Sequence, residues 1–553
     1  MKNGKADLHN SNILKYLDRV SSRPFVRHLI YSGSVIFFFG IILVPPILGI
    51  FLKWNTIGEI FQIPGLMARA SSAIYASFAI AFLVASLDLV AGLPLAWFIA
   101  RGKSRWLNII DTLADMPFII PTVTLGYSLL LFWNRDEGVS QFFGGNSLVP
   151  EGWLLIALLH FAFSYPAVVR VIVGAILDYK VVYEEAARTL GAAPVTADRT
   201  VTLPILKSSL IAAFTLAFSR SLSETGATVI VAGTFENGVV FINNTRTQTE
   251  GAMVFVSLIL ILAASLVYLV IRLLGPRLGM PVKRVWPYAE RKLSHSGVRV
   301  ARDSLTSVIF FAFVLIPSLF IILPIVSAVT GGTLNQAIAG VGVWQGYWQS
   351  LLLSYFVATV VTLMNVLFSL PMAVLIARER WGAGVSAVLD VFSNVPLIVP
   401  SIALGASMGI FWRRFAFIPE VALVIFAHLS ITYPYFVRAM VGAVERVTMD
   451  LEEASRTLGA KPFTVFRTII VPLTKYSLFA GTIMMFARSV DETGATLAVV
   501  TQLKTVPVLL VGWVKGTTIP TATPLDTALG AGLLVLFSFV ILLVLRLVVR
   551  GRY

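Results

Sequence analysis

The sequence lacks cysteine altogether and has few charges, and both absences restrict what the protein can be. With no cysteine among 553 residues, it has no disulfide framework, no thiolate nucleophile and no cysteine-ligated metal or iron–sulfur site. Charged residues make up 13% of the chain and hydrophobic residues 57%, which leaves too little polar surface to cover water-soluble cores. The five histidines show no spacing typical of metal ligands. The composition therefore predicts an integral membrane protein without a metal site.

Positive charge is the one kind of charge in excess, with a formal net charge of +15. A basic membrane protein usually carries such an excess in its cytoplasmic loops and not on a nucleic-acid-binding surface. We therefore expect membrane lipid around this chain and no nucleic-acid partner.

Apolar runs long enough to cross a bilayer, roughly 20 residues each, recur about twelve times, six in each half of the chain. The sequence thus predicts an all-α polytopic membrane protein with two parallel six-helix repeats. The predicted spans are 28–54, 71–100, 108–133, 153–178, 205–233, 252–275, 306–330, 349–377, 386–412, 419–443, 473–500 and 525–549.

Loop charges predict the orientation of these spans, because cytoplasmic loops are rich in Lys and Arg. Segment 1–27 carries six Lys and Arg residues and no cleavage site of small residues, so we expect it to be a cytoplasmic N-terminal segment before an uncleaved first span. The C-terminus is also expected in the cytoplasm. Arg413 and Arg414 lie in a predicted outer loop and are the clear exception to the pattern.

The basic, proline-containing segment 276–305 is expected to be a cytoplasmic linker between two membrane domains, 28–275 and 306–553. A lipid-binding polybasic patch is the alternative. The domains repeat each other, as Tyr165-Pro166 of the first half recurs as Tyr433-Pro434 in the second. Because each repeat has an even number of predicted spans, both enter the membrane in the same direction and predict a central pathway between them.

The strongest repeated motif lies in a predicted cytoplasmic loop of each half. Segments 183–204 and 451–472 agree at 13 of 22 positions, more than hydrophobicity alone would require. In each segment, apolar and small residues spaced three and four positions apart lie on one face of a short amphipathic helix. Gly191 and Gly459 are positioned to end each helix in a left-handed conformation. The pattern shared by the halves indicates a surface that matches something outside the bilayer.

These loops resemble the EAA loops of permeases in binding-protein-dependent type I ABC importers, and the whole chain resembles two such permease domains fused together. The resemblance implies two cytoplasmic ABC ATPase subunits, an extracytoplasmic substrate-binding protein and a multi-pass location in the cell (inner) membrane. Ser455 departs from the strict pattern but keeps the small volume. The implied ATPase-coupling residues are Glu185, Ala186, Ala187, Gly191, Glu453, Ala454, Ser455 and Gly459.

The chain itself is not expected to be an enzyme, to hold a cofactor or to hydrolyse ATP. Gly102-Lys103-Ser104 resembles the end of a phosphate-binding loop, but Trp97 stands where the first glycine of that motif should be. We therefore expect no catalytic residue, and separate subunits to supply the ATP hydrolysis.

Ionisable residues in apolar helices are costly unless they face a partner, water or a cavity. Such residues and their repeated threonine neighbours are therefore candidates for a pathway or gate, with a structural Arg–Glu pair through Arg220 and Arg488 as the alternative. These candidates are Glu224, Thr225, Thr228, Asp491, Glu492, Thr493 and Thr496.

Other intramembrane polar groups favour structural roles. His160 and His428 correspond between the halves and are expected to be satisfied by hydrogen bonds, while Arg170 is expected near the cytoplasmic boundary. The prolines Pro117, Pro121, Pro396 and Pro400 are predicted to break a helix at corresponding places of each half, as a pathway with exposed backbone or a bending gate would use, with packing kinks as the alternative.

The resemblance implies transport of a small solute from the binding protein to the cytoplasm, but its cues for the solute conflict. Fused permeases of this layout resemble those for ferric iron, thiamine or phosphonates, whereas the stretch 223–228 is similar to permeases for the oxyanions sulfate, molybdate and phosphate. Ferric iron or an oxyanion is the favoured class. An ion- or proton-coupled secondary transporter is the alternative function.

Overall fold

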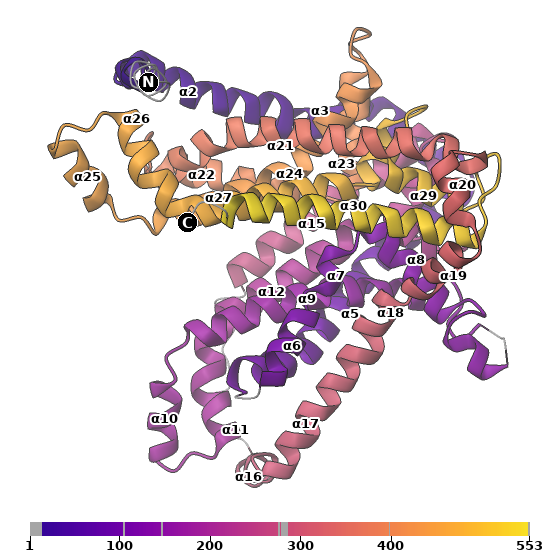
Figure 1. Ribbon diagram of the computed structural model, residues 1–553, viewed down its shortest axis with the longest axis horizontal. Helices are drawn as coiled ribbons and strands as arrows, with labels where there is room; N and C mark the ends of the chain where they lie inside the picture. The colour runs from indigo at the N-terminus through magenta and orange to yellow at the C-terminus, as the bar shows by residue number, and fades with distance from the viewer. Residues whose placement is uncertain are drawn as a thin grey trace, which may run out of the picture.

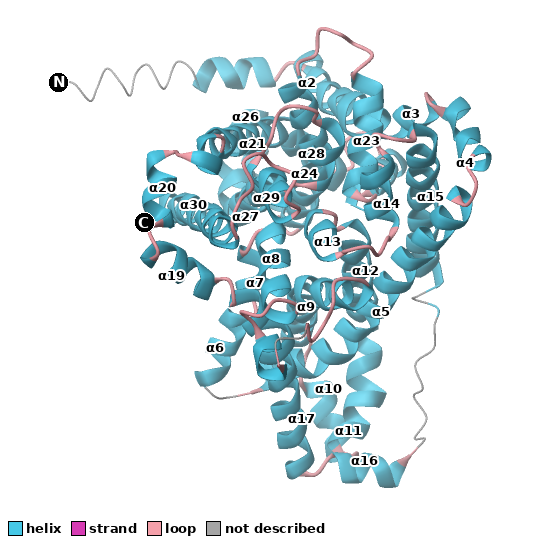
Figure 2. Ribbon diagram, turned by 90° about the vertical axis from the view of Figure 1, so that its right-hand side faces the viewer, coloured by secondary structure: helices cyan, strands magenta, loops and turns pink. Residues whose placement is uncertain are grey.

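The computed structural model describes residues 14–102, 105–144, 147–274, 277, 286–397 and 399–550, and within these ranges it is helical with no strand (Figure 2). Ten helices, some of them built from consecutive segments, are long and apolar enough to cross a membrane. They are Pro24–Phe51, Leu66–Arg101, Trp153–Asp178, Pro194–Ser223, Glu250–Ile271, Ser296–Thr330, Gly342–Ala377, Glu420–Glu445, Pro462–Asp491 and Pro524–Val544.

The elements fall into two equivalent series along the chain. Those of the first half are α2 (Pro24–Phe37), η1 (Phe38–Leu43), α3 (Val44–Phe51), η2 (Trp54–Gly58), α4 (Glu59–Gln62), α5 (Leu66–Arg101), α6 (Arg105–Leu113), α7 (Met116–Ile119), α8 (Thr122–Trp133), η3 (Val139–Phe143), α9 (Trp153–Asp178), α10 (Val182–Thr189), α11 (Pro194–Ala197), η4 (Asp198–Thr202), α12 (Leu203–Ser223), α13 (Gly226–Val231), α14 (Gly238–Thr245) and α15 (Glu250–Leu274). Those of the second half are α16 (Pro287–Leu293), α17 (Ser296–Ile309), η6 (Phe310–Leu315), α18 (Ile316–Leu319), α19 (Ile322–Thr330), α20 (Thr333–Ala339), η7 (Gly342–Gln345), α21 (Tyr347–Ala377), α22 (Ala383–Ser393), η8 (Val395–Leu397), α23 (Ser401–Trp412), α24 (Glu420–Glu445), α25 (Met449–Thr457), α26 (Pro462–Val465), η9 (Phe466–Ile470), α27 (Val471–Asp491), α28 (Gly494–Val499), α29 (Val506–Val514) and α30 (Pro524–Arg550).

Two of the twelve predicted spans are broken helices. Segment 386–412 forms α22 and α23, which meet at an angle of 103°, and segment 108–133 forms α6, α7 and α8. The breaks fall at Pro117 and Pro121 and at Pro396 and Pro400, because proline removes a helical hydrogen bond and clashes with the preceding turn. The count in the described residues is therefore ten spans, or eleven if the bent pair is counted as one.

The helices form two arms that meet at one end of the molecule and diverge towards the other (Figure 1). In the first arm α5, α9 and α12 pack against one another, and in the second arm α21, α24 and α27 do the same. Helices α10 and α25 lie at the diverging end, which we call the loop-helix end (Figure 1). Helices α8 and α29 lie where the arms meet.

The first span of each half crosses over to the arm of the other half. Helix α2 packs on α21 and α3 on α23, whereas α17 packs on α5 and α18 on α8. Phe37 stacks on Phe368 with ring centroids 4.1 Å apart. At the equivalent contact, the Thr306 hydroxyl donates to the Ala91 carbonyl at 3.2 Å.

A buried serine fixes each crossing span by the same pair of hydrogen bonds. The Ser128 hydroxyl donates to the Pro317 carbonyl at 2.7 Å and accepts from the Ile321 amide at 3.0 Å. The hydroxyl of Ser407, the equivalent residue, donates to the Pro46 carbonyl and accepts from the amide of Ile50. The two halves are thus interlocked and do not form two separate bundles.

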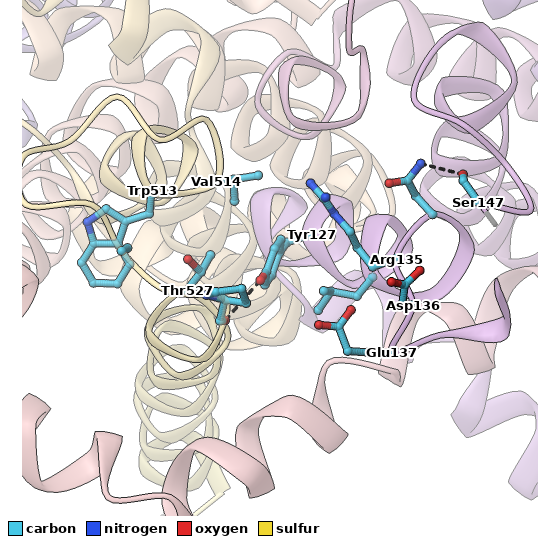
Figure 3. Close-up of a pocket in the computed structure, with 12 residues that line it drawn as sticks. Tyr127, Arg135, Asp136, Glu137, Ser147, Trp513, Val514 and Thr527 are labelled. Carbon is cyan, nitrogen blue, oxygen red and sulfur yellow. Dashed lines mark hydrogen bonds between the residues drawn. The ribbon is translucent and has the colours of Figure 1, made fainter. Parts of the chain in front are cut away.

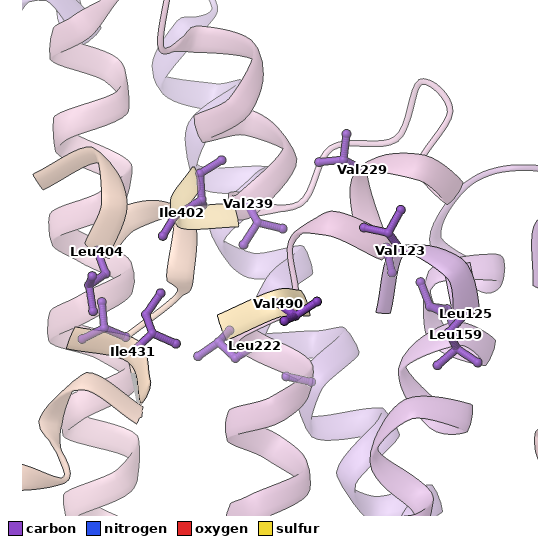
Figure 4. Packing of buried hydrophobic residues seen from close by; sticks show 14 of the residues in the cluster. Val123, Leu125, Leu159, Leu222, Val229, Val239, Ile402, Leu404, Ile431 and Val490 are labelled. Atoms are coloured by element: carbon purple, nitrogen blue, oxygen red, sulfur yellow. The ribbon is translucent and has the colours of Figure 1, made fainter. Parts of the chain in front are cut away.

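Apolar side chains from both arms fill the place where the arms meet. Figure 4 shows Leu222 and Val490, at the ends of α12 and α27, within the same buried cluster as Val123 and Ile402. This cluster surrounds the short helices α13 and α28 and positions their ends.

Candidate functional site

The repeated loop motif forms helices α10 and α25 at the tips of the two arms (Figure 1). Each ends at a glycine with a φ of +87°, Gly191 and Gly459. The amide of Gly191 donates to the Arg188 carbonyl at 3.0 Å, and the following amide of Ala192 donates to the Ala187 carbonyl at 3.1 Å. This is the Schellman arrangement that reverses the chain after a helix, and the second loop repeats it. The predicted left-handed glycines are confirmed.

Acidic side chains tie both loop helices to the end of a membrane span. Glu184 binds Arg101, the last residue of α5, at 3.1 Å. In the second half Glu452 binds Arg378 at 2.8 Å, and the Arg378 guanidinium also donates to the Val447 carbonyl. The sequence analysis did not predict these anchors. The repeated Ala-Arg pair at 100–101 and 377–378 was the signal that could have revealed them.

The predicted coupling residues lie at the surface of these helices. Glu185, Ala186, Glu453 and Ala454 are exposed together with both glycines, while Ala187 and Ser455 are half-buried. Beside them Leu190 and Leu458 are 90% and 89% exposed. Tyr183 and Leu451, on the same faces as Leu190 and Leu458, are also exposed, so each loop presents an apolar patch of the kind that a partner covers.

A short helix that precedes the first span of each half is hydrogen-bonded to one of the two repeated loops. Asp18, in the helical stretch 14–21, accepts from the Thr464 amide at 2.9 Å and its hydroxyl at 2.6 Å, on α26. Glu290 on α16 accepts from the Thr196 hydroxyl on α11 at 2.6 Å. Thr196 and Thr464 occupy equivalent positions of the two repeats. Segment 1–27 and the linker therefore contribute equivalent braces, which the sequence analysis did not predict.

The candidate gate residues meet between the arms. A Cβ added to Gly226 would lie 2.6 Å from the Thr493 Cβ, and one added to Gly494 would lie 2.6 Å from the Thr225 Cβ. The starts of α13 and α28 therefore touch each other, and only glycine permits this approach. Thr225 and Thr493 are 2% exposed. We call these four residues the central contact.

The neighbouring acids are held by specific partners. Glu492 binds Arg488 at 2.6 Å and accepts from the Ala495 amide at 2.8 Å. Asp491 crosses between the arms, because it accepts from the Thr122 amide at 2.6 Å. Ser223 stands at the equivalent position of the first half and has no carboxylate, and there the Ser401 hydroxyl donates to the Ser223 backbone carbonyl at 3.5 Å instead.

Other predicted residues adjoin the central contact in the sequence but have partners of their own. Thr228 and Thr496 bind the ring nitrogens of His160 and His428, each at 2.8 Å, which confirms that the two histidines are satisfied. The Glu224 carboxylate accepts a local hydrogen bond from the amide of Ala227, three residues further along the chain, at 3.1 Å.

Arg170 has partners to which the sequence analysis assigned no role. Its guanidinium binds the Asp111 carboxylate at 2.6 Å and also that of Asp115. These bonds join the broken segment α6–α7 to α9. The equivalent residue of the second half, Arg438, is exposed.

Comparison with known proteins shows a repeated family match. The model of the family described as binding-protein-dependent transport system inner membrane component matches residues 92–280 and again residues 365–552. Both loop helices and both halves of the central contact lie within the matched ranges.

Each of three individual relatives matches less than half of this chain. The sulfate transport system permease protein CysT of Salmonella typhimurium is 31% identical over 246 residues, which is 43% of this chain and 84% of the relative. The molybdenum transport system permease protein ModB of Escherichia coli is 33% identical over 169 residues, 28% of this chain and 73% of the relative. The molybdate/tungstate transport system permease protein WtpB of Pyrococcus furiosus is 29% identical over 207 residues, which is 37% of this chain and 79% of the relative.

Proposed function

The chain belongs to the family of binding-protein-dependent transport system inner membrane components, and on that premise we propose that it is the complete membrane channel of an ATP-driven importer for a small oxyanion. Its domains 28–275 and 306–553 act as two fused permease units, connected by the cytoplasmic linker. The oxyanion comes from an extracytoplasmic binding protein and leaves in the cytoplasm.

The observation that carries this proposal is the pair of exposed loop helices at the tips of the arms. Each presents small residues and one nearly fully exposed leucine, Leu190 or Leu458, on a helix whose base is fixed by ion pairs. Two such surfaces suit two ATPase subunits. The contacts with each subunit are assigned to Glu185, Ala186, Ala187 and Gly191 on α10, and to Glu453, Ala454, Ser455 and Gly459 on α25.

The divergence of the arms supports a mechanism of alternating access. The loop-helix end is the cytoplasmic end in this proposal, and both chain termini are placed on that side. When ATP draws the two ATPase subunits together, α10 and α25 approach each other and the arms rotate as rigid bodies. The central contact then separates and admits the anion from outside. Thr225, Thr493 and Asp491 act in this gate.

Two kinds of evidence favour an oxyanion over ferric iron, thiamine or phosphonate. The relatives reported above are named for sulfate, molybdenum and molybdate/tungstate. The outer loops also contain arginines where the positive-inside rule expects few, and positive charge attracts an anion. The secondary-transporter alternative gives no reason for two exposed loop helices with matched sequences.

Reconstitution tests this function. The chain is placed in proteoliposomes with the ATPase and binding protein of its own system, and uptake of radiolabelled sulfate and molybdate is measured with and without ATP inside. We expect uptake of at least one of these anions that needs both ATP and the binding protein. Uptake that persists without ATP and collapses with an uncoupler would establish the secondary transporter instead.

A further inference from the structure

Two adjoining hollows lie at the end of the molecule opposite the loop helices, on the seam between the two halves. The first, of about 460 Å³, is lined by residues of α13, α14, α28 and α29. The second, of about 500 Å³, is lined by residues of α15 and α23. Both are lined by Arg246, Val500 and Thr501. We call the two hollows together the outer vestibule.

The vestibule adjoins the central contact. Val229 and Leu497 line its first hollow, and they lie on α13 and α28, the two short helices whose first residues form the central contact. A solute in the vestibule therefore stands on the outer side of the closed gate. Separation of α13 from α28 would open a way from this space to the interior.

The lining of the vestibule carries six cations, Lys53, Arg246, Arg413, Arg414, Lys504 and Lys515. Apart from Lys53, none of the six forms an ion pair with a carboxylate in the described part of the chain. The one acid of the lining, Glu250, is already bound to Lys53 at 2.7 Å. The outer vestibule therefore has an excess of positive charge.

Two of these cations, Arg246 and Arg413, line the second hollow together. Burial lowers the pKa of the Arg246 guanidinium, and the positive charge of Arg413 lowers it further. Arg413 is held in place because its guanidinium donates to the Val499 carbonyl at 2.8 Å. Like charges that the fold holds together are stabilised by an anion between them.

A polar group without a partner completes the lining. The Thr518 side chain, 8% exposed, lines the first hollow, and its hydroxyl oxygen has no hydrogen-bond partner among the described residues. A buried hydroxyl loses free energy when it makes no hydrogen bond. It can donate to an oxyanion in the hollow.

The pseudo-symmetric hollow shows that this charge is not a consequence of the repeat. That hollow, of about 500 Å³, lies beside α8 and α29 and is shown in Figure 3. It is lined by Val514, the equivalent of Arg246 in the second repeat, and by Asn134, which follows Trp133 as Arg413 follows Trp412. Asp136 and Glu137 also line it, beside Arg135 (Figure 3). Of these two equivalent places, only the outer vestibule therefore has a positive excess.

We propose that the outer vestibule is an oxyanion-binding site, in which Arg246 and Arg413 hold the anion after the binding protein releases it and before the gate opens. The inference rests on the proposed function, which supplies the direction of transport and the class of anion. It accounts for Arg413, whose position in an outer loop the positive-inside rule does not explain.

Because the chain lacks cysteine, single cysteines can report the charge of each hollow. Thr247→Cys lies in the vestibule and Ala522→Cys in the control hollow of Figure 3. Each variant, in nanodiscs with its ATPase subunits and without ATP, is treated with anionic and cationic methanethiosulfonate reagents. We expect the ratio of anionic to cationic rates to be about tenfold higher in the vestibule. Equal ratios in the two hollows would overturn the proposal.

Sulfate and molybdate serve as the probe anions, compared with chloride at the same ionic strength. We expect either probe to slow modification of the Thr247→Cys variant, and the added substitutions Arg246→Gln and Arg413→Gln to remove this protection. Protection that survives both substitutions, or that chloride gives equally, would contradict the site. Protection given only by the empty binding protein would identify a docking surface for that protein and would also overturn the proposal.

Uptake measurements separate this inference from the proposed function. If the vestibule variant is protected by the anions but the reconstituted importer takes up neither, the proposed function fails and the site stands. If uptake occurs but neither charge selectivity nor protection is found, the site fails alone. In the importer, Arg246→Gln should raise the half-saturating anion concentration by about tenfold, whereas Arg135→Gln in the control hollow should not.

Discussion

At the scale of single residues, the two loop helices are anchored by equivalent ion pairs with unequal burial. The Arg378 and Glu452 side chains are 3% and 2% exposed, whereas those of Arg101 and Glu184 are 23% and 13% exposed. A charge left without its partner costs more free energy the more deeply it is buried. The two anchors should therefore respond differently to the same substitution.

Glu452→Gln should lower the free energy of unfolding by about 3 kcal/mol, because it leaves the buried Arg378 charge unpaired. Glu184→Gln should cost only about 1 kcal/mol in its more exposed setting. Thermal unfolding of the purified protein in detergent compares the two variants, with Glu453→Gln at an exposed neighbouring position as the control. Equal melting temperatures for Glu452→Gln and Glu184→Gln would contradict the unequal burial.

The central contact depends on two glycines, and each can be tested by adding one methyl group. Gly494→Ala would place a Cβ 2.6 Å from the Thr225 Cβ, closer than packed atoms approach, so α13 and α28 should separate. We expect passive leakage of sulfate from liposomes without ATP to rise above that of the unsubstituted chain. Gly442→Ala, whose added Cβ would meet nothing within 4 Å, is the matched control. A folded Gly494→Ala variant that leaks no more than this control would argue against a gate here.

Residue-scale features were predictable from sequence where a local rule applied. Gly191 and Gly459 followed from helix-capping geometry, and the satisfied His160 and His428 followed from the cost of burying polar groups. The bond from Thr122 to Asp491 was not predictable, because it joins residues that are far apart in the sequence. The anchor of Glu452 on Arg378 also joins distant residues, and its signal in the sequence was the repeated Ala-Arg pair at 377–378. Only the tertiary packing brings such residues together.

At the scale of elements, the main difference from the expected structure is the position of the first spans. Two repeats would be expected to form two bundles side by side, but the first span of each half packs in the arm of the other half. Hydropathy identifies which residues lie in the bilayer, but lipid is as apolar as another helix, so it does not identify the neighbours of a span. The breaks at Pro117, Pro121, Pro396 and Pro400 were predictable, because proline disfavours the interior of a helix. Proline alone does not fix the place of a break, since Pro94, Pro166, Pro371 and Pro434 lie inside continuous helices. The crossing of α2–α3 and α17–α18 was not predictable.

The serines that hold the crossing spans provide an element-scale test. Ser407→Ala removes the acceptor of the buried Ile50 amide and should reduce the free energy of unfolding by about 1–3 kcal/mol. Ser128→Ala should have a similar effect, because its bonds to the other crossing span are equivalent. Ser327→Ala is the control, since that exposed hydroxyl bonds only within its own helix. Resistance to proteolysis measures the effect, and three equally resistant variants would show that these bonds do not hold the spans.

At the scale of the whole molecule, the central contact lies between the loop helices at one end and the outer vestibule at the other. The arms diverge at the loop-helix end while the central contact is closed (Figure 1). Force applied at α10 and α25 can therefore be transmitted along α9–α12 and α24–α27 to the gate. The direction of the two arms could not be predicted from the sequence, whereas the duplication and the matched loops could.

The measurement that tests the central claim most directly is capture of the ATPase by the loop helices. Three single-cysteine variants, Leu190→Cys, Leu458→Cys and Ile519→Cys, are crosslinked in native membranes; the three side chains are 90%, 89% and 99% exposed, and Ile519 is the control, in the loop after α29 away from both loop helices. We predict that the first two capture the same ATP-hydrolysing subunit and that the third does not. If neither loop position captures such a subunit under efficient labelling, α10 and α25 are not coupling helices and the importer mechanism is contradicted.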